Sequence, residues 1–477
     1  MKPLPGPGFL IGTEWREIST RQSVLNPYTG SLVAEVCQAQ AQDIEDAIQL
    51  SVSAFSTLSE LPSHARATAL STIAQQLTSR LKEFAHVMSL ESGKPITDAR
   101  REVQRAIQTF TIASEEAKRL PGETIPMDIS PGMEPYLGIL RRVSIGPVLG
   151  ITPFNFPLNL VAHKVAPCLA VGNPILLKPA PQTPFTALLL GEIICGLGLP
   201  PGTFSVLPCE NDLAESMVRD PRIQALSFTG SASVGWRLKE KAGKKRVALE
   251  LGGNAAVIIE PDANLSLAAQ RCATGGFSYA GQTCISVQRI YLHQDIYDPF
   301  LKLLLDQIRA LPCGDPLQES TVVGPLINQQ TAIRVESWIQ EAIKQGAECL
   351  LGGTRQNAIV APTVLANVSP TMKVSCEEIF GPVVTVSRYQ DFSEVLRRVN
   401  DSPYGLQAGI YTQDINRIFQ AYRELEVGAV LANEIPTWRA DHMPYGGVKD
   451  SGLGREGVRY AMQELTEPKL LVLSLPQ

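Results

Sequence analysis

The feature that most constrains the fold of this chain is an alternation of buried strands and helices that starts at residue 148. Stretches of apolar residues long enough for strands lie at 148–154, 173–179, 204–208, 224–230 and 246–253. Helical segments lie between them, within 183–200, near 211–219 and at 231–243. Strands that alternate with helices pair in parallel, because each helix returns the chain to the same edge. The pattern predicts a parallel sheet of the dinucleotide-binding type.

A second alternating series extends from about 255 to 435. It includes the strands 255–261, 382–389 and 408–412 and a long helix at 329–345. The chain has 477 residues, which is too long for one ordinary hydrophobic core. We therefore expect an α/β protein with two domains that are joined near 250–254.

The first third of the chain shows a different pattern. Residues 38–119 have helical periodicity, with a helix that Asp43 caps and that continues through Phe55, a second helix over 63–92 and a third over 94–119. Residues 121–135 are rich in Pro, Gly and Met, and 136–143 resemble a strand.

Charge and cysteine usage exclude several classes of protein. The net charge is −5 with scattered Lys and Arg, which argues against nucleic acid and membrane-surface partners. Nine cysteines without a C-x-x-C pair, and five histidines without metal-binding spacing, argue against disulfides and a metal site. No signal peptide or membrane helix is expected, since His163 and Lys164 interrupt the most apolar stretch, 147–177. A cytoplasmic location fits these features.

Three short segments carry the chemistry. Cys284 ends the polar loop Gly-Gln-Thr-Cys, which would expose a thiolate nucleophile. Glu250 closes an apolar strand before two glycines and could take a proton from water or a thiol. Asn155, at a strand end, could donate a hydrogen bond to a developing oxyanion. Taken singly, a buried cysteine, a capping Glu and a turn-forming Asn are the commoner roles.

Together, these segments resemble the aldehyde dehydrogenase superfamily from about residue 23 to the C-terminus. The matching motifs are ITPFNFP (151–157), LLKPA (176–180), FTGS (228–231), ELGG (250–253), GQTC (281–284), EEIFGPV (377–383) and PYGGVKDSGLGREG (444–457). The resemblance implies that Cys284 attacks the aldehyde carbon. Asn155 and the Cys284 amide would hold the oxyanion, and Glu250 would activate the water that hydrolyses a thioester.

The resemblance also implies a nucleotide site. Lys178 would bind the adenosine ribose, and Pro181 stands where NAD-preferring members usually have Glu, so NADP should be tolerated or preferred over NAD. Amides at Gly230, Ser231 and Gly235 would meet the pyrophosphate. The full set of cofactor-binding residues expected is Ile151, Thr152, Pro153, Phe154, Lys178, Ala180, Pro181, Gly230, Ser231, Gly235, Leu251, Glu378 and Phe380. The G-x-G-x-x-G at 452–457 follows no buried strand and is not expected to bind nucleotide.

By resemblance, residues 1–120 and 141–252 form the cofactor domain and 253–444 the catalytic domain. Residues 121–140 and 445–477 would form a small β oligomerisation element. The apolar tail at 469–475 would be an exposed edge on its own, so a homodimer or homotetramer is expected.

Substrate choice is the least determined property. The stretch 433–447 resembles members that act on lactaldehyde, phosphorylated three-carbon aldehydes or semialdehydes, and Arg439 and His442 could contact the substrate. An ion pair is an equally good role for Arg439. Thr283 stands where members that bind phosphorylated aldehydes often have Arg, which slightly disfavours a phosphate. Asn254 and Tyr445 replace Lys and Phe of many relatives, and neither change is expected to touch the chemistry.

Two other functions stay open at this stage. A CoA-acylating dehydrogenase of the same fold usually lacks the Glu of the ELGG motif, so Glu250 argues against it. A cofactor-independent cysteine hydrolase or acyltransferase would use Cys284 without nicotinamide. Ser278 is a poor nucleophile candidate because its G-x-S-x-G pattern lacks the last glycine.

Overall fold

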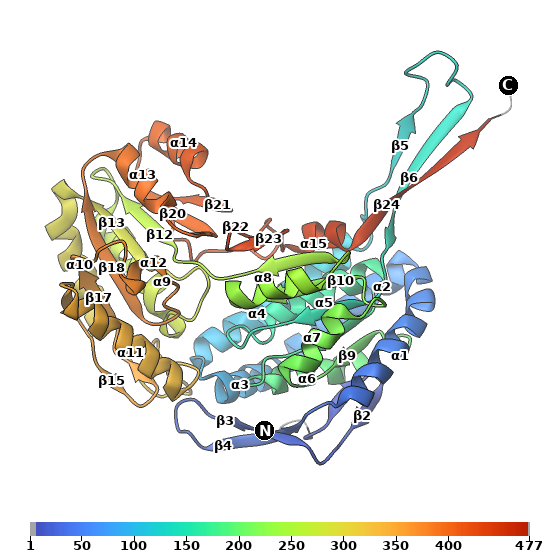
Figure 1. Ribbon diagram of the computed structural model, residues 1–477, viewed down its shortest axis with the longest axis horizontal. Coiled ribbons are helices and arrows are strands. Elements are labelled where there is room, and N and C mark those ends of the chain that lie inside the picture. Colours follow the sequence, from blue (N-terminus) through green and yellow to red (C-terminus); the bar gives the residue numbers. More distant parts are fainter. Residues whose placement is uncertain (1–5, 476–477) are drawn as a thin grey trace.

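The computed structural model describes residues 6–475, and its first part is built on an eight-stranded sheet (Figure 1). The order is β2-β1-β9-β8-β7-β10-β11-β23. The bounds are β1 Phe9–Ile11, β2 Glu14–Arg16, β7 Val148–Ile151, β8 Ile175–Lys178, β9 Phe204–Val206, β10 Ala225–Thr229, β11 Arg246–Glu250 and β23 Gly452–Leu453. The five strands from β9 to β11 are parallel. The predicted parallel sheet is confirmed, with antiparallel strands added at both sides.

Helices cover this sheet. The crossover helices are α5 Asn159–Val171, α6 Pro184–Cys195, α7 Asn211–Arg219 and α8 Ala232–Lys241, and every residue of α5 is buried. The preceding helices are α1 Ala41–Glu60, α2 Ser63–Ser79, α3 Leu81–Ser92 and α4 Ile96–Glu116. In α1, Asp43 occupies the third helical position and accepts a hydrogen bond from the backbone of Gln40, so it completes a capping box rather than beginning the helix.

The single helix predicted over 63–92 is wrong, because the chain breaks at Arg80. The backbone of Arg80 leaves the helical region (φ −103°, ψ 12°) and its guanidinium binds Glu83 and Glu192. These two contacts fix a change of direction between α2 and α3 that apolar periodicity does not reveal.

A seven-stranded sheet forms the second part, in the order β14-β17-β18-β13-β12-β20-β21. Its strands are β12 Ala256–Ile259, β13 Arg289–His293, β14 Glu348–Leu351, β17 Thr363–Ala366, β18 Val383–Tyr389, β20 Gln407–Tyr411 and β21 Ala429–Ala432. The main helices are α9 Leu265–Phe277, α10 Tyr297–Arg309, α11 Gln329–Lys344, α13 Phe392–Asn400 and α14 Ile415–Glu424. All pairs except β14–β17 are parallel, so the second predicted α/β series is also confirmed.

A three-stranded antiparallel sheet projects from the body of the molecule (Figure 1). It consists of β5 Glu123–Pro126, β6 Tyr136–Ser144 and β24 Thr466–Ser474. Between β23 and β24, α15 Val458–Glu464 packs against α5, and Val458 and Met462 belong to the first hydrophobic core. The tail strand β24 pairs with β6 of the same chain. Within the C-terminal segment, β23 joins the first sheet through β11.

The sequence analysis did not predict the N-terminal strands β1 and β2. It also did not predict the hairpin of β3 Arg21–Leu25 and β4 Leu32–Cys37. Among residues 6–475, none of the helices combines the length and the apolar character that crossing a membrane requires.

Candidate active site

Cys284 lies on a loop whose backbone is held in a strained conformation. The preceding short helix, η1 Ser278–Gly281, contains three successive residues in the left-handed region: Tyr279 (φ 51°), Ala280 (φ 53°) and Gly281 (φ 68°). The buried side chain of Gln282 fixes the loop, since its oxygen accepts from the Ile327 amide at 2.9 Å. Left-handed non-glycine residues persist only where packing enforces them. The fold therefore fixes where the following cysteine lies.

The sulfur of Cys284 contacts a hydroxyl from a distant part of the chain. The Sγ atom lies 3.0 Å from the Oη atom of Tyr445. Burial raises the pKa of Cys284 to about 12, and the contact with Tyr445 opposes this shift. The sequence analysis did not expect Tyr445 to touch the chemistry, but its hydroxyl contacts the sulfur of the predicted nucleophile. By contrast, the side chain of Asn254 binds the backbone of Ser375 and the hydroxyl of Ser402.

Asn155 faces the same loop from the end of β7. Its Nδ2 atom donates to the Gln282 carbonyl at 3.0 Å, while its Oδ1 atom is buried without a partner. The Asn155 carbonyl accepts from the Lys94 ammonium at 2.6 Å, which fixes the backbone behind it. In the described part of the chain, the backbone N–H of Cys284 has no acceptor. Asn155, which bonds the loop of the cysteine, and the free backbone N–H of Cys284 are the kinds of donor that an oxyanion site requires.

Glu250 ends β11 inside the molecule. Both of its carboxylate oxygens are buried, and neither has a hydrogen-bond partner among the described residues. Burial raises the pKa of Glu250 well above its ordinary value, and the charge of Glu456 raises it further against the opposing charges of Arg439 and Lys164. A carboxyl with a raised pKa is a stronger base than a free glutamate, and an unpartnered buried one is typical of a general base.

A network of buried charges surrounds this carboxyl. Arg439 pairs with Glu456 at 3.0 Å and contacts His163 at 3.2 Å. Lys164 lies 3.7 Å from the other oxygen of Glu456 and donates to Thr229 at 2.7 Å. The ion-pair role that the sequence analysis allowed for Arg439 is therefore confirmed, while His163, Lys164 and Glu456 were not assigned to the site. A signal for two of them was present, because the polar residues 163 and 164 interrupt an otherwise apolar segment.

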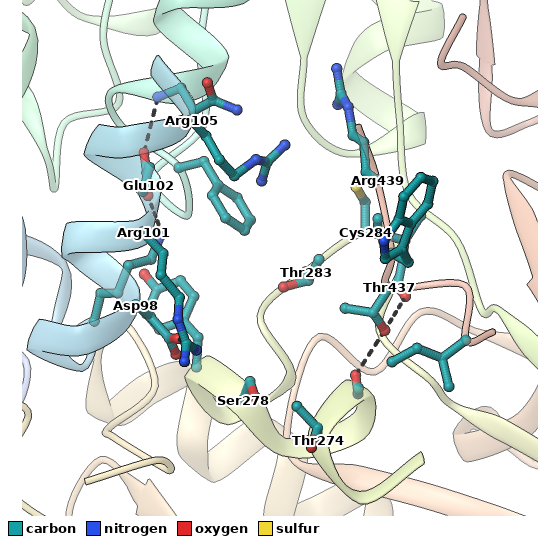
Figure 2. A pocket seen from close by; sticks show the side chains of 18 of the residues that line it. Asp98, Arg101, Glu102, Arg105, Thr274, Ser278, Thr283, Cys284, Thr437 and Arg439 are labelled. Atoms are coloured by element: carbon teal, nitrogen blue, oxygen red, sulfur yellow. Dashed lines mark hydrogen bonds and ion pairs between the residues drawn. The ribbon is translucent and has the colours of Figure 1, made fainter. Parts of the chain in front are cut away.

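A cavity of about 320 Å³ opens in front of Cys284 (Figure 2). One wall comes from α4, with Asp98, Arg101, Glu102 and Arg105, and the opposite wall carries Cys284, Thr437 and Arg439. The remaining lining residues are Lys94, Phe156, Asn159, Leu160, Arg271, Thr274, Gly275, Ser278, Tyr279, Thr283, Ile285, Ile435, Trp438 and Tyr445. Five of the lining side chains are basic and two are acidic. Each of the five also pairs with a carboxylate, and Arg101 is the most exposed of them. His442 is exposed and does not line it.

The expected cofactor residues gather at the carboxyl ends of the parallel strands. Ile151 ends β7 and leads into Thr152, Pro153 and Phe154, while Lys178 ends β8 and precedes Ala180 and Pro181. Gly230 and Ser231 lie between β10 and α8, with Ser231 at the N-cap position. The Gly230 and Gly235 amides donate to the carbonyls of Glu250 and Ser231, so the expectation that these two amides meet the pyrophosphate is wrong. A Cβ atom on Gly235 would lie 2.4 Å from the Leu251 side chain, so this glycine permits close approach of helix and sheet. Carboxyl ends of parallel strands are where dinucleotides bind in such folds.

The second domain contributes Glu378 and Phe380 to this region. Glu378 accepts from the Gly253 amide at 3.1 Å, and burial raises its pKa to about 7. The rings of Phe380 and Phe154 meet edge to face at 5.8 Å. A Cβ atom on Gly252 would lie 2.3 Å from the Glu378 carboxylate, so glycine leaves this carboxylate room. A carboxylate with a free oxygen beside aromatic rings fits a nicotinamide ribose and ring.

Near Lys178, where the adenosine ribose is expected, lies an acidic residue that the sequence analysis missed, Glu210. The Lys178 ammonium donates to the Asn211 side chain at 3.2 Å, and the charge of Glu210 acts on Lys178. Pro181 has no acidic side chain, and its carbonyl accepts from Gln22 at 3.2 Å. An acidic group, Glu210, therefore acts on Lys178 after all, but it comes from the N-cap position of α7, in the segment after β9.

Comparison with known proteins supplies a family for this arrangement. The family model described as "Aldehyde dehydrogenase family" matches residues 15–471. The chain is 43% identical over 469 residues to a 3-sulfolactaldehyde dehydrogenase of Priestia aryabhattai, with 98% of each chain covered. It is also similar to the structure of aldehyde dehydrogenase 21 from Physcomitrella patens in complex with the reaction product succinate (TM-score 0.96, 43% identity, 98% of each chain). The structure of glyceraldehyde-3-phosphate dehydrogenase GapN from Methanocaldococcus jannaschii complexed with NADP matches with TM-score 0.92 and 37% identity, covering 96% of this chain and 100% of that one.

Proposed function

The chain belongs to the aldehyde dehydrogenase family and oxidises aldehydes with NAD(P)+, and we propose that it does so through a thioester on Cys284. The observation that carries this proposal is that Asn155 bonds the loop of Cys284 at Gln282, while the charge of Glu250 acts on Cys284. The unpartnered carboxyl of Glu250 and the free backbone N–H of residue 284 support it.

The first half of the reaction forms the thioester. The Cys284 thiol releases its proton to solvent water, and the sulfur forms a bond to the aldehyde carbon, which moves the carbonyl electron pair onto oxygen. Asn155 and the backbone N–H of Cys284 donate hydrogen bonds to that oxyanion. When bound, the nicotinamide would supply the acceptor for the hydride that leaves the tetrahedral carbon, and Glu378 and Phe380 would hold it. Loss of that hydride leaves the acyl group on sulfur.

The second half releases the acid. Glu250 takes a proton from water as the water oxygen bonds to the thioester carbon, and collapse of that adduct breaks the carbon–sulfur bond. The acid leaves and the Cys284 thiolate is restored. A coenzyme A acceptor would not need such a base, so the buried Glu250 favours water as the acyl acceptor.

The preferred aldehyde is a short one that carries a sulfonate or a carboxylate. The basic lining of the cavity supports this, and so do the names of two relatives, since sulfolactaldehyde and succinate are anions. A panel of anionic aldehydes and their neutral analogues, run with NAD+ and NADP+ and without coenzyme A, tests the proposed function. We expect reduced nicotinamide to form without coenzyme A, and kcat/KM to be higher for the anionic aldehydes.

Two arginines at the cavity should provide this preference. Arg101 and Arg271 each pair with one carboxylate, Asp98 and Glu434 respectively, and both are accessible enough to bind a further anion. A charged hydrogen bond contributes about 1.5–3 kcal/mol. Arg101→Gln and Arg271→Gln should therefore each lower kcat/KM for an anionic aldehyde by about tenfold, with little effect on its neutral analogue.

The matched control for this prediction is Arg309→Gln. Arg309 pairs with Asp306 at 3.1 Å three residues away, as Arg101 does with Asp98, but it lies on α10. Equal losses for charged and neutral aldehydes in the Arg101 and Arg271 variants would contradict the assignment.

For the nucleotide, we propose that NADP is tolerated alongside NAD, because position 181 has no carboxylate. Glu210 now becomes the group that limits NADP, since its charge would act against a 2′-phosphate near Lys178. Glu210→Gln should raise kcat/KM for NADP+ by about three- to tenfold relative to NAD+, from the loss of a like charge. An unchanged ratio would place Glu210 away from the phosphate.

We also propose that the enzyme is a homodimer or homotetramer in the cytoplasm. The projecting strand β24 presents Leu470, Leu471, Val472 and Leu473 to solvent, and another subunit would cover them. All nine cysteines are free, which suits a reducing compartment.

A further inference from the structure

The contact between Tyr445 and Cys284 assigns a new role within this active site. We propose that the Tyr445 hydroxyl donates a hydrogen bond to the Cys284 thiolate, and that Arg439, stacked on the Tyr445 ring, is the positioning residue that holds this donor. The inference rests on the proposed function of Cys284 as the nucleophile. It assigns Tyr445 and Arg439 to stabilising the sulfur, whereas Asn155 and the backbone N–H of Cys284 stabilise the oxyanion.

The position of Tyr445 is enforced from several sides. Its ring is 3% exposed, and its backbone exchanges two hydrogen bonds with that of Glu456, at 3.0 and 2.6 Å. Among the described residues its hydroxyl contacts Cys284 alone. A buried hydroxyl usually finds a partner, and here that partner is the nucleophilic sulfur.

The direction of the hydrogen bond follows from the charge state of the sulfur. In the resting thiol either atom can donate, but a thiolate has no proton and can only accept. A hydrogen bond to an ionised group is stronger than one between neutral groups. The contact therefore stabilises the thiolate more than the thiol. This matters here because burial disfavours the charged form of Cys284.

Arg439 completes the arrangement from the other face of the ring. Its guanidinium carbon lies 3.7 Å from the centre of the Tyr445 ring, a cation–π contact, and its side chain is 6% exposed. The same guanidinium pairs with Glu456 and contacts His163. These partners fix the position of Arg439, so we assign it to holding the Tyr445 ring rather than to binding substrate. Arg101 and Arg271 are then the arginines left to bind an anionic substrate. Burial raises the pKa of the Tyr445 hydroxyl, and the charge of Arg439 opposes that rise.

Alkylation of the enzyme without nucleotide tests the tyrosine directly. Iodoacetamide should label Cys284 of Tyr445→Phe about five- to tenfold more slowly than wild type at each pH between 7 and 9, because the thiolate loses a charged hydrogen bond. Labelling is read by peptide mass mapping at residue 284. Tyr389→Phe, which removes a buried hydroxyl from the second domain, is the matched control and should label at the wild-type rate. Slowing by less than threefold in Tyr445→Phe would overturn the proposal.

Kinetics and a double variant separate the tyrosine from the arginine. Tyr445→Phe should slow the pre-steady-state burst of reduced nicotinamide by a similar factor and leave the hydrolysis step unchanged. Arg439→Gln should slow labelling in wild type but not further in Tyr445→Phe, and Arg439→Lys, which keeps the charge, should recover part of the rate. Additive effects of Arg439→Gln and Tyr445→Phe would refute the coupling. A wild type without any burst would instead refute the proposed function, while the labelling comparison would still report on the tyrosine.

Discussion

Cys284→Ala should abolish aldehyde oxidation, with kcat lowered by at least about ten-thousand-fold, because no other group can form the covalent intermediate. Binding of NAD(P)+, followed by quenching of tryptophan fluorescence, should change by less than about twofold, since the nucleotide residues lie at the strand ends of the first sheet. Cys349→Ala removes another half-buried thiol, at strand β14, and should keep wild-type activity.

Comparing aldehyde oxidation with nucleotide binding in Cys284→Ala separates an effect on the chemistry from an effect on the fold. If Cys284→Ala lost nucleotide binding as well, the substitution would have disturbed the fold rather than the chemistry. If oxidation persisted above a hundredth of the wild-type rate, the nucleophile would have to be another residue.

Glu250→Gln should uncouple the two halves of the reaction. The first turnover should still release nearly one equivalent of reduced nicotinamide per site, because thioester formation does not need this carboxyl as the base for water. Steady-state turnover should then fall by about 10²–10³-fold, within the range expected for loss of a general base. Glu260→Gln, which neutralises a buried carboxyl in the second domain, is the control and should turn over normally.

The pH dependence of the wild type should follow the same carboxyl. Burial and the charge of Glu456 raise the pKa of Glu250, so this group is protonated over a wider acidic range than a free glutamate. A protonated carboxyl cannot accept a proton from water. The hydrolysis rate should therefore rise as pH increases through that raised pKa, and this rise should be absent in Glu250→Gln. A fast steady state in Glu250→Gln would remove Glu250 from the role of base.

How much of this could be predicted from sequence depends on whether the signal is local. Asn155, Glu250 and Cys284 each stand in a short motif, and the alternation of strands and helices fixes their strands, so sequence alone nominated them. The parallel sheets followed from the same alternation. The break at Arg80 did not, because it depends on an ion pair with Glu192, more than a hundred residues away.

Contacts across the fold account for the other gaps. Tyr445 and Cys284 are separated by 161 residues, and a tyrosine in place of phenylalanine adds one hydroxyl whose partner only the tertiary structure reveals. The sequence analysis looked for an acidic residue beside the adenosine ribose only at position 181. Glu210 acts on Lys178 from the N-cap position of α7 instead. Lys164 was visible as a charge in an apolar run, but its neighbours Glu456 and Glu250 come from distant segments.

Direct observation of the acylated sulfur tests the central claim. Glu250→Gln, mixed with an aldehyde substrate and NAD(P)+ and quenched in acid within one turnover, should carry one added acyl group, located by peptide mass mapping on Cys284. The Cys284→Ala, Glu250→Gln double variant should carry none. An acyl group on a different residue, or an unmodified protein after a full equivalent of nicotinamide has been reduced, would contradict the thioester mechanism.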